Sequence, residues 1–150
     1  MQLSPRVRER AAPGDAAERA LHGCLLLYLL ASLTHFMHNA HELQHYPHMP
    51  PWLSGALVMG AWLALSALGA LGYWLYRSVS PLWGLALIAL YGLCGLDALA
   101  HYAVEPFAAH TLAMHVTIVG EALAGVGLAG AVLYYSPVLM RVQVRVRSRA

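Results

Sequence analysis

Residues 34 to 51 read THFMHNAHELQHYPHMPP and carry five histidines and one glutamate between His35 and His48. An apolar run precedes this stretch and three prolines follow its centre, so it lies at the end of a predicted helix. Histidine and carboxylate side chains are common ligands of transition metals. The stretch therefore predicts a metal site at the edge of an apolar helix, with further ligands supplied by the rest of the chain.

The composition indicates a membrane protein. Of the 150 residues, 59% are hydrophobic and only 11% are charged, which is far from the balance of a soluble domain. Four apolar stretches are each near the roughly 20 residues that a helix needs to cross the hydrocarbon layer. The predicted fold is an all-α integral membrane protein, a four-transmembrane-helix bundle with spans at residues 21–45, 52–76, 81–104 and 110–135.

The arginines predict the orientation of this bundle. They lie in the N-terminal tail (residues 1–20), at Arg77 and in the basic C-terminal tail (residues 138–150), whereas the loops at 47–51 and 105–109 have none. By the positive-inside rule both termini are cytoplasmic. We expect a bacterial inner (plasma) membrane protein whose bundle spans residues 21–137 and whose histidine-rich loops face the outer side.

The first span carries the densest group of candidate ligands. His38, Glu42 and His45 are spaced by four and three residues, which places them on one helical face. His35 lies above the same stripe and His41 at its margin. Unpaired imidazoles below a membrane interface need partners, and these side chains are each other's nearest candidates.

The third and fourth spans add ionisable residues at similar depth. In the third span Asp97, His101 and Glu105 repeat every four residues and share a face. In the fourth span His115 points roughly 120° away from His110 and Glu121 at 100° per residue. Glu121 should lie about 16 Å below the outer end of its span, near the bilayer centre, where ionisable groups are costly and usually functional.

These positions give two sets of predicted site residues. The predicted metal ligands are His38, His41, His45, Asp97, His101 and His115. The residues predicted to form a second shell or a proton path are His35, Glu105, His110 and Glu121.

Residues 41 to 45, HELQH, match the H-E-x-x-H pattern and resemble the zinc motif of the zincin metalloproteases. Site-two intramembrane proteases are similar in carrying this pattern on a first core span and an L-D-G motif on the third. Leu96 and Asp97 lie in a similar place here, with Ala98 instead of the glycine. The resemblance implies that Glu42 is catalytic and that His41 and His45 bind zinc.

Mixed histidine and carboxylate ligands favour zinc or iron, as one or two ions, over copper(I), which prefers thiolates and thioethers. Our first hypothesis is a small membrane metalloenzyme, a hydrolase or a di-iron enzyme. The second is a divalent-metal transporter, chaperone or sensor with a vestibule at His41, His45 and His48. The third, a haem-binding electron-transfer subunit using His38 with His101 or His115, leaves the carboxylates unexplained.

The expected partners follow from the same features. Membrane lipid surrounds the spans, and four helices are few for a transporter, so the second hypothesis predicts a homo-oligomer with close contacts at small residues such as Gly120 and Gly130. The basic residues lie beside the spans and lack interleaved aromatics, so no nucleic-acid binding is expected.

Overall fold

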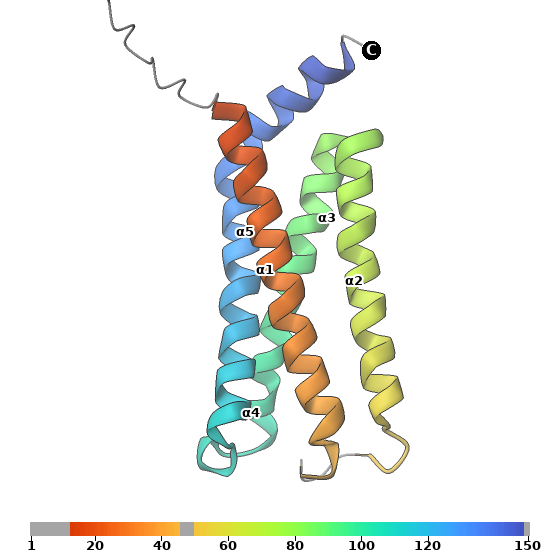
Figure 1. The fold of residues 1–150 in the computed structure, drawn as a ribbon, viewed down its shortest axis with the longest axis vertical. Helices are drawn as coiled ribbons and strands as arrows, with labels where there is room; N and C mark the ends of the chain where they lie inside the picture. Colours follow the sequence, from red (N-terminus) through yellow and green to blue (C-terminus); the bar gives the residue numbers. More distant parts are fainter. Residues whose placement is uncertain (1–12, 46–49, 149–150) are drawn as a thin grey trace, which may run out of the picture.

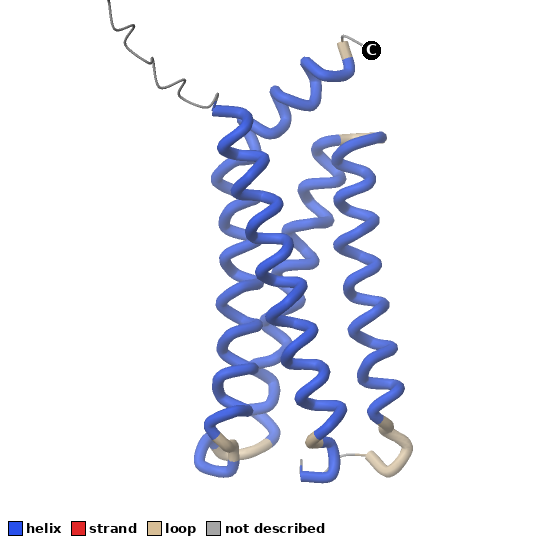
Figure 2. The backbone as a smooth tube through the Cα atoms, viewed as in Figure 1, coloured by secondary structure: helices blue, strands red, loops and turns tan. Residues whose placement is uncertain are grey.

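The computed structural model describes residues 13–45 and 50–148, which form a bundle of long helices (Figure 1). Every regular element within those residues is helical, as Figure 2 shows. The long helices are α1 (Pro13–His41), α2 (Gly55–Ser78), α3 (Pro81–Cys94) and α5 (Leu112–Arg147). Shorter segments connect or extend them: η1 (Leu43–His45), η2 (Gly95–Ala100), α4 (His101–Val104) and η3 (Phe107–Ala109).

Four segments of the described chain are long and apolar enough to cross a membrane: Pro13–His41, Gly55–Ser78, Pro81–Val104 and Leu112–Val146. Large apolar side chains cover the outside of the bundle, including Leu63, Trp74 and Leu123. Such a surface is unfavourable in water and matches the hydrocarbon of a bilayer. The predicted all-helical class with four membrane-length helices is confirmed, and the sidedness of the termini stays a prediction.

The bundle has two distinct ends (Figure 1). The start of α1, the end of α5 and the turn between α2 and α3 lie together at what we call the termini end. The connection between α1 and α2 and the connection between α4 and α5 lie at the opposite end, which we call the loop end. The histidine-rich stretch of the sequence belongs to the loop end.

The first and last helices end at other residues than predicted. The first helix runs from Pro13 to His41 instead of from 21 to 45, because the chain bends at Glu42 and then forms one 3₁₀ turn, with a 2.8 Å hydrogen bond from His45 N to Glu42 O. The last helix continues through Pro137 instead of ending at residue 135. A proline inside a helix removes one hydrogen bond and bends the helix without necessarily ending it. The final turns of α5 lean away from the bundle (Figure 1).

The third span changes its helical form along its length. The α-helix α3 ends at Cys94, and the six residues of η2 continue it as a 3₁₀ helix before α4. Gly95 opens this segment, and a Cβ atom at this position would lie 2.7 Å from Cε2 of Tyr28. A 3₁₀ stretch of this length inside a span is uncommon and often marks a functional segment. Asp97 lies within it.

Helix α5 packs along both α1 and α3, whereas α2 packs mainly on α3. The core between them contains Tyr28, Tyr91 and Leu128, and the two tyrosine rings meet edge to face with centroids 4.6 Å apart. Glycines allow α3 and α5 to approach closely, since a Cβ atom on Gly92 would lie 2.7 Å from the carbonyl oxygen of Gly125. This close contact fixes the position of α5 along α3, and with it the level of the side chains on α5.

Polar contacts join three helices at the termini end. Glu18 of α1 accepts a 2.7 Å hydrogen bond from the Tyr76 hydroxyl of α2 and a 3.2 Å hydrogen bond from the Gln143 amide of α5. Arg77 lies 3.6 Å from the other carboxylate oxygen. Tyr76 and Gln143 are both buried. These contacts satisfy the polar groups that the bundle encloses there.

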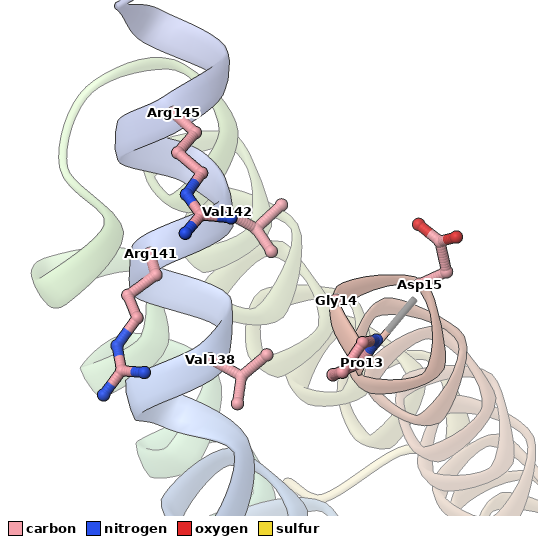
Figure 3. A pocket seen from close by; sticks show the side chains of 7 residues that line it. All are labelled: Pro13, Gly14, Asp15, Val138, Arg141, Val142 and Arg145. Carbon is pink, nitrogen blue, oxygen red and sulfur yellow. The ribbon is translucent and has the colours of Figure 1, made fainter. Parts of the chain in front are cut away.

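A cavity of about 320 Å³ also lies at the termini end, between the start of α1 and the end of α5 (Figure 3). Its lining includes Gly14, Val138, Arg141 and Arg145. The two arginines, which are exposed, extend from the same side of α5.

The glycine contact between α3 and α5 generates the first prediction. An alanine at Gly125 would press its Cβ atom against the carbonyl oxygen of Gly92 and within 3.2 Å of Tyr28. We expect Gly125→Ala to lower the free energy of unfolding by about 1–3 kcal/mol, as overpacking of a tight contact does. Thermal unfolding followed by circular dichroism in detergent measures the loss.

The matched control is Gly127→Ala, on the same helix. A Cβ atom there meets nothing within 4 Å, and alanine favours the helix over glycine. The midpoint of unfolding should therefore stay the same or rise. Equal losses in the two variants would contradict the close packing of α3 on α5.

Candidate functional site

The packing of α1 on α5 brings a histidine and a glutamate together inside the bundle. His35 is 2% exposed and Glu121 is 1% exposed. His35 Nε2 lies 3.7 Å from Glu121 Oε2. Neither oxygen of Glu121 has a hydrogen-bond partner among the described residues, and neither has Nδ1 of His35. Buried polar atoms in proteins are almost always paired, so this pair marks an unusual position in the fold.

Asn39 connects this pair to a second histidine. It follows His35 by one helical turn, and its amide donates from Nδ2 to Nε2 of His35 at 2.9 Å and to Nε2 of His101 at 3.2 Å. The two imidazole rings meet edge to face with centroids 5.3 Å apart. Because both Nε2 atoms accept a hydrogen bond, both present the lone pair with which a neutral imidazole binds a metal.

A small polar cavity adjoins these side chains. Its volume is about 100 Å³, and His35, Phe36, Asn39, Asp97 and His101 line it together with Ala98. Asp97, which lies in η2, is itself exposed. A water molecule takes about 30 Å³ of liquid, so the cavity has room for an ion and a few waters.

His115 belongs to a different group, at the loop end. Its Nδ1 atom lies 2.9 Å from the hydroxyl of Tyr102, and its ring stacks on Phe107 with centroids 3.9 Å apart. The same helix thus directs Glu121 into the bundle and His115 into an aromatic cluster. The ring of His110 lies beside that of His115, with centroids 5.7 Å apart, and the role of His115 as a metal ligand stays a prediction.

His110 lies between the two groups. It is buried, and it donates from Nδ1 to the carbonyl oxygen of Pro106 at 3.1 Å. Its ring centroid lies 6.4 Å from that of His101. His110 is therefore placed beside His101, and its predicted second-shell role stays a prediction.

The HELQH motif forms a group of its own on the surface of the loop end. Glu42 accepts 2.8 Å contacts from Nδ1 of His41 and from Nδ1 of His45, whose side chains are 85% and 73% exposed. The motif does not lie on one continuous helix, because α1 ends at His41. In the zincin arrangement the two histidines project from one helical face and the glutamate activates water. The catalytic role of Glu42 stays a prediction.

The predicted site residues thus divide into separate places. The structure places His35 beside both Glu121 and His101, and Asp97 lines the same cavity as the two histidines. His41 and His45 lie with Glu42, and His115 lies with Tyr102. Partly buried His38 has an Nδ1 atom without a hydrogen-bond partner in the described part of the chain. Glu105 is partly buried at the end of α4, and His48 lies outside the described residues.

Within residues 13–45 and 50–148, no three His, Cys, Asp or Glu side chains are arranged so that they could hold one metal ion as they stand. Asn39 is not among the residues predicted from the sequence, because an amide is not a usual transition-metal ligand. Its spacing of four residues from His35 is the signal that could have found it.

Comparison of the chain with protein-family models, with curated proteins and with solved structures gives no match. The fold and the site together define the class of protein. Its described residues form an all-helical bundle with four helices of membrane length and a buried pair of a histidine and a glutamate.

The contacts of Glu42 generate the second prediction. The hydrogen bond from His41 is the largest cause that holds the pKa of the Glu42 carboxyl below its usual value, and His45 contributes further. His41→Ala should therefore raise this pKa toward the usual value, and His45→Ala should raise it as well. A pH titration of the Glu42 carboxyl carbon by NMR measures both shifts.

The sign of the linked effect follows from the direction of the shift. Because the pKa is lower in the folded state, the stabilisation from these contacts is present above the usual pKa of glutamate and is lost as the pH falls through the lowered value. A Glu42 pKa that does not change in His41→Ala would show that the contact at the end of α1 does not form.

Proposed function

We propose that this protein binds a divalent transition-metal ion inside the helical bundle, through His35, His101 and Glu121. The observation that carries the proposal is the state of the Glu121 carboxylate. It is 1% exposed, and neither of its oxygens accepts a hydrogen bond from the described residues. A carboxylate in such a position is very costly unless a cation or a proton compensates its charge.

The neighbours of Glu121 favour a metal cation as the compensating charge. No lysine or arginine within the described chain forms an ion pair with Glu121. The ionisable side chain beside it is His35, whose Nε2 atom lies 3.7 Å from Oε2 of Glu121. Neutral imidazoles suit a metal ion and repel a positive charge less than protonated ones would. His35 and His101 would supply two nitrogen ligands, and Glu121 would supply an oxygen.

The set of ligand atoms narrows the choice of metal. Two imidazole nitrogens and one carboxylate oxygen suit zinc, iron or manganese. The three proposed ligand atoms are nitrogen and oxygen, whereas copper(I) prefers sulfur ligands. A porphyrin is too large for a cavity of about 100 Å³, so haem fits this site poorly.

Metal binding requires a local change of the side chains. The amide of Asn39 now occupies the lone pairs of both histidines, and a bound ion would take its place there. Asp97 lines the same cavity and would offer an additional carboxylate. The cavity would hold the water that completes the coordination of a zinc or iron ion with three protein ligands.

The metal decides between the functions that this site could serve. Bound zinc would point to hydrolysis, because zinc lowers the pKa of its bound water. Bound iron would point to oxygen chemistry. A metal that exchanges readily would favour a transporter, chaperone or sensor, for which the exposed His41 and His45 at the loop end would collect ions.

The third prediction tests the proposed ligands. Native protein purified in detergent without added metal should contain about one zinc, iron or manganese ion per chain, measured by inductively coupled plasma mass spectrometry. Glu121→Gln keeps the size of the side chain but removes its charge, and His35→Ala removes an imidazole. Each should lower the metal content to about a tenth or less, since each removes one of three ligands.

The control is His22→Ala. His22 also lies on α1, but it contacts the Tyr73 hydroxyl at 2.8 Å and lies far from the cavity in the sequence of that helix. Its metal content should equal that of the native protein. Native protein that remains free of metal after incubation with zinc, iron and manganese salts, or Glu121→Gln protein that keeps its metal, would contradict the proposal.

A further inference from the structure

The cavity at the termini end lies between the start of the first helix and the end of the last (Figure 3). Its volume of about 320 Å³ is at the low end of the range for small-ligand sites, about 300–1,000 Å³. Apolar residues form one part of its wall, with Pro13 on α1 and Val138 and Val142 on α5, and Arg141 and Arg145 form another. The cavity therefore combines an apolar wall with two neighbouring positive charges.

The charges of these two arginines are not balanced by other described residues. The arginines are one helical turn apart on α5, where like charges repel each other. Within residues 13–45 and 50–148 neither of them forms an ion pair, whereas Arg77 lies beside Glu18. Asp15 also lines the cavity, but its carboxylate points away from both guanidinium groups in Figure 3. An anion held by both arginines would remove the repulsion between them.

In a bilayer the cavity would lie at the level of the lipid head groups. The 36 residues of α5 extend about 54 Å, whereas the hydrocarbon layer is about 30 Å thick. Exposed Tyr134 and its neighbour Tyr135 are residues typical of the boundary between hydrocarbon and head groups. Arg141 follows about 10 Å further along the helix, and the final turns of α5 lean away from the bundle (Figure 1). The two arginines thus lie just outside the hydrocarbon.

Exposed valines on the same segment favour a lipid over a free anion as the ligand. Val144 and Val146 are 62% and 54% exposed, on either side of Arg145 in the sequence. Basic and apolar side chains together on the surface of a helix are typical of a segment that lies in a membrane interface. A free phosphate ion would satisfy the arginines but leave these valines in water, whereas a phospholipid layer covers both.

We infer that the cavity binds the phosphate group of an anionic phospholipid through Arg141 and Arg145, with the glycerol and the start of the acyl chains against Val138 and Val142. Guanidinium groups bind phosphate oxygens with pairs of parallel hydrogen bonds. The predicted orientation would place this end in the cytoplasmic leaflet, which carries anionic lipids. The inference does not rest on the proposed metal site, because about 33 Å along α1 separates Pro13 at the cavity from His35.

The fourth prediction is saturable binding of about one phosphatidylglycerol molecule per chain, measured by native mass spectrometry of the full chain in detergent as the lipid is added. Phosphatidylcholine carries the same phosphate with a compensating positive charge and should bind about tenfold more weakly. Arg141→Gln and Arg145→Gln should each weaken phosphatidylglycerol binding about tenfold, since each loses charge-assisted hydrogen bonds. Arg141→Lys keeps the charge and should bind the lipid more tightly than Arg141→Gln.

The matched control is Arg77→Gln. Arg77 is exposed and lies at the same end of the bundle, but it lies beside Glu18 and does not line the cavity. This variant changes the net charge by the same amount and should bind phosphatidylglycerol as the native protein does. Because Arg141 and Arg145 are exposed, their variants should keep the native circular dichroism spectrum and the native metal content.

Three results would overturn the inference. The first is equal binding of phosphatidylglycerol and phosphatidylcholine by the native protein. The second is equal weakening by Arg77→Gln and by the two cavity variants, which would indicate an effect of net charge alone. The third is displacement of the lipid by inorganic phosphate at the same concentration as the lipid, which would assign the cavity to a free anion.

Discussion

The burial of Glu121 is the constraint on which the arrangement of this bundle depends. Its carboxylate lies beside His35, inside a protein whose surface is largely apolar. Evolution rarely keeps an ionisable group at such a place without a use for it. The tight glycine contact of α3 with α5 and the packing of α5 on α1 hold this side chain at one level of the bundle. The position of the Glu121 carboxylate therefore depends on how these helices pack.

Asn39 gives the site its second feature. One amide nitrogen contacts the Nε2 atoms of two histidines from helices far apart in the sequence. Asn39 also lines an apolar cavity between α1 and α2.

The apolar stretches predict four membrane-length helices, and the positions of Asp97 and Glu121 within them identify ionisable groups in the spans. The pairing of side chains could not be predicted, because helix spacing shows which residues share a face but not which face turns toward a neighbour. His35 and Glu121, predicted as outer-shell residues, form the buried pair, whereas His41 and His45 lie at the surface after the helix ends. The 3₁₀ segment around Asp97 also departs from the assumed 100° per residue.

X-ray absorption spectroscopy of the purified protein tests the central claim most directly, because it identifies the metal and its nearest atoms together. The account predicts a zinc, iron or manganese edge and a first shell of nitrogen and oxygen atoms near about 2.0–2.2 Å, with the outer-shell scattering of two imidazoles. A first shell of sulfur atoms, or a shell without imidazole scattering, would contradict the site at His35, His101 and Glu121.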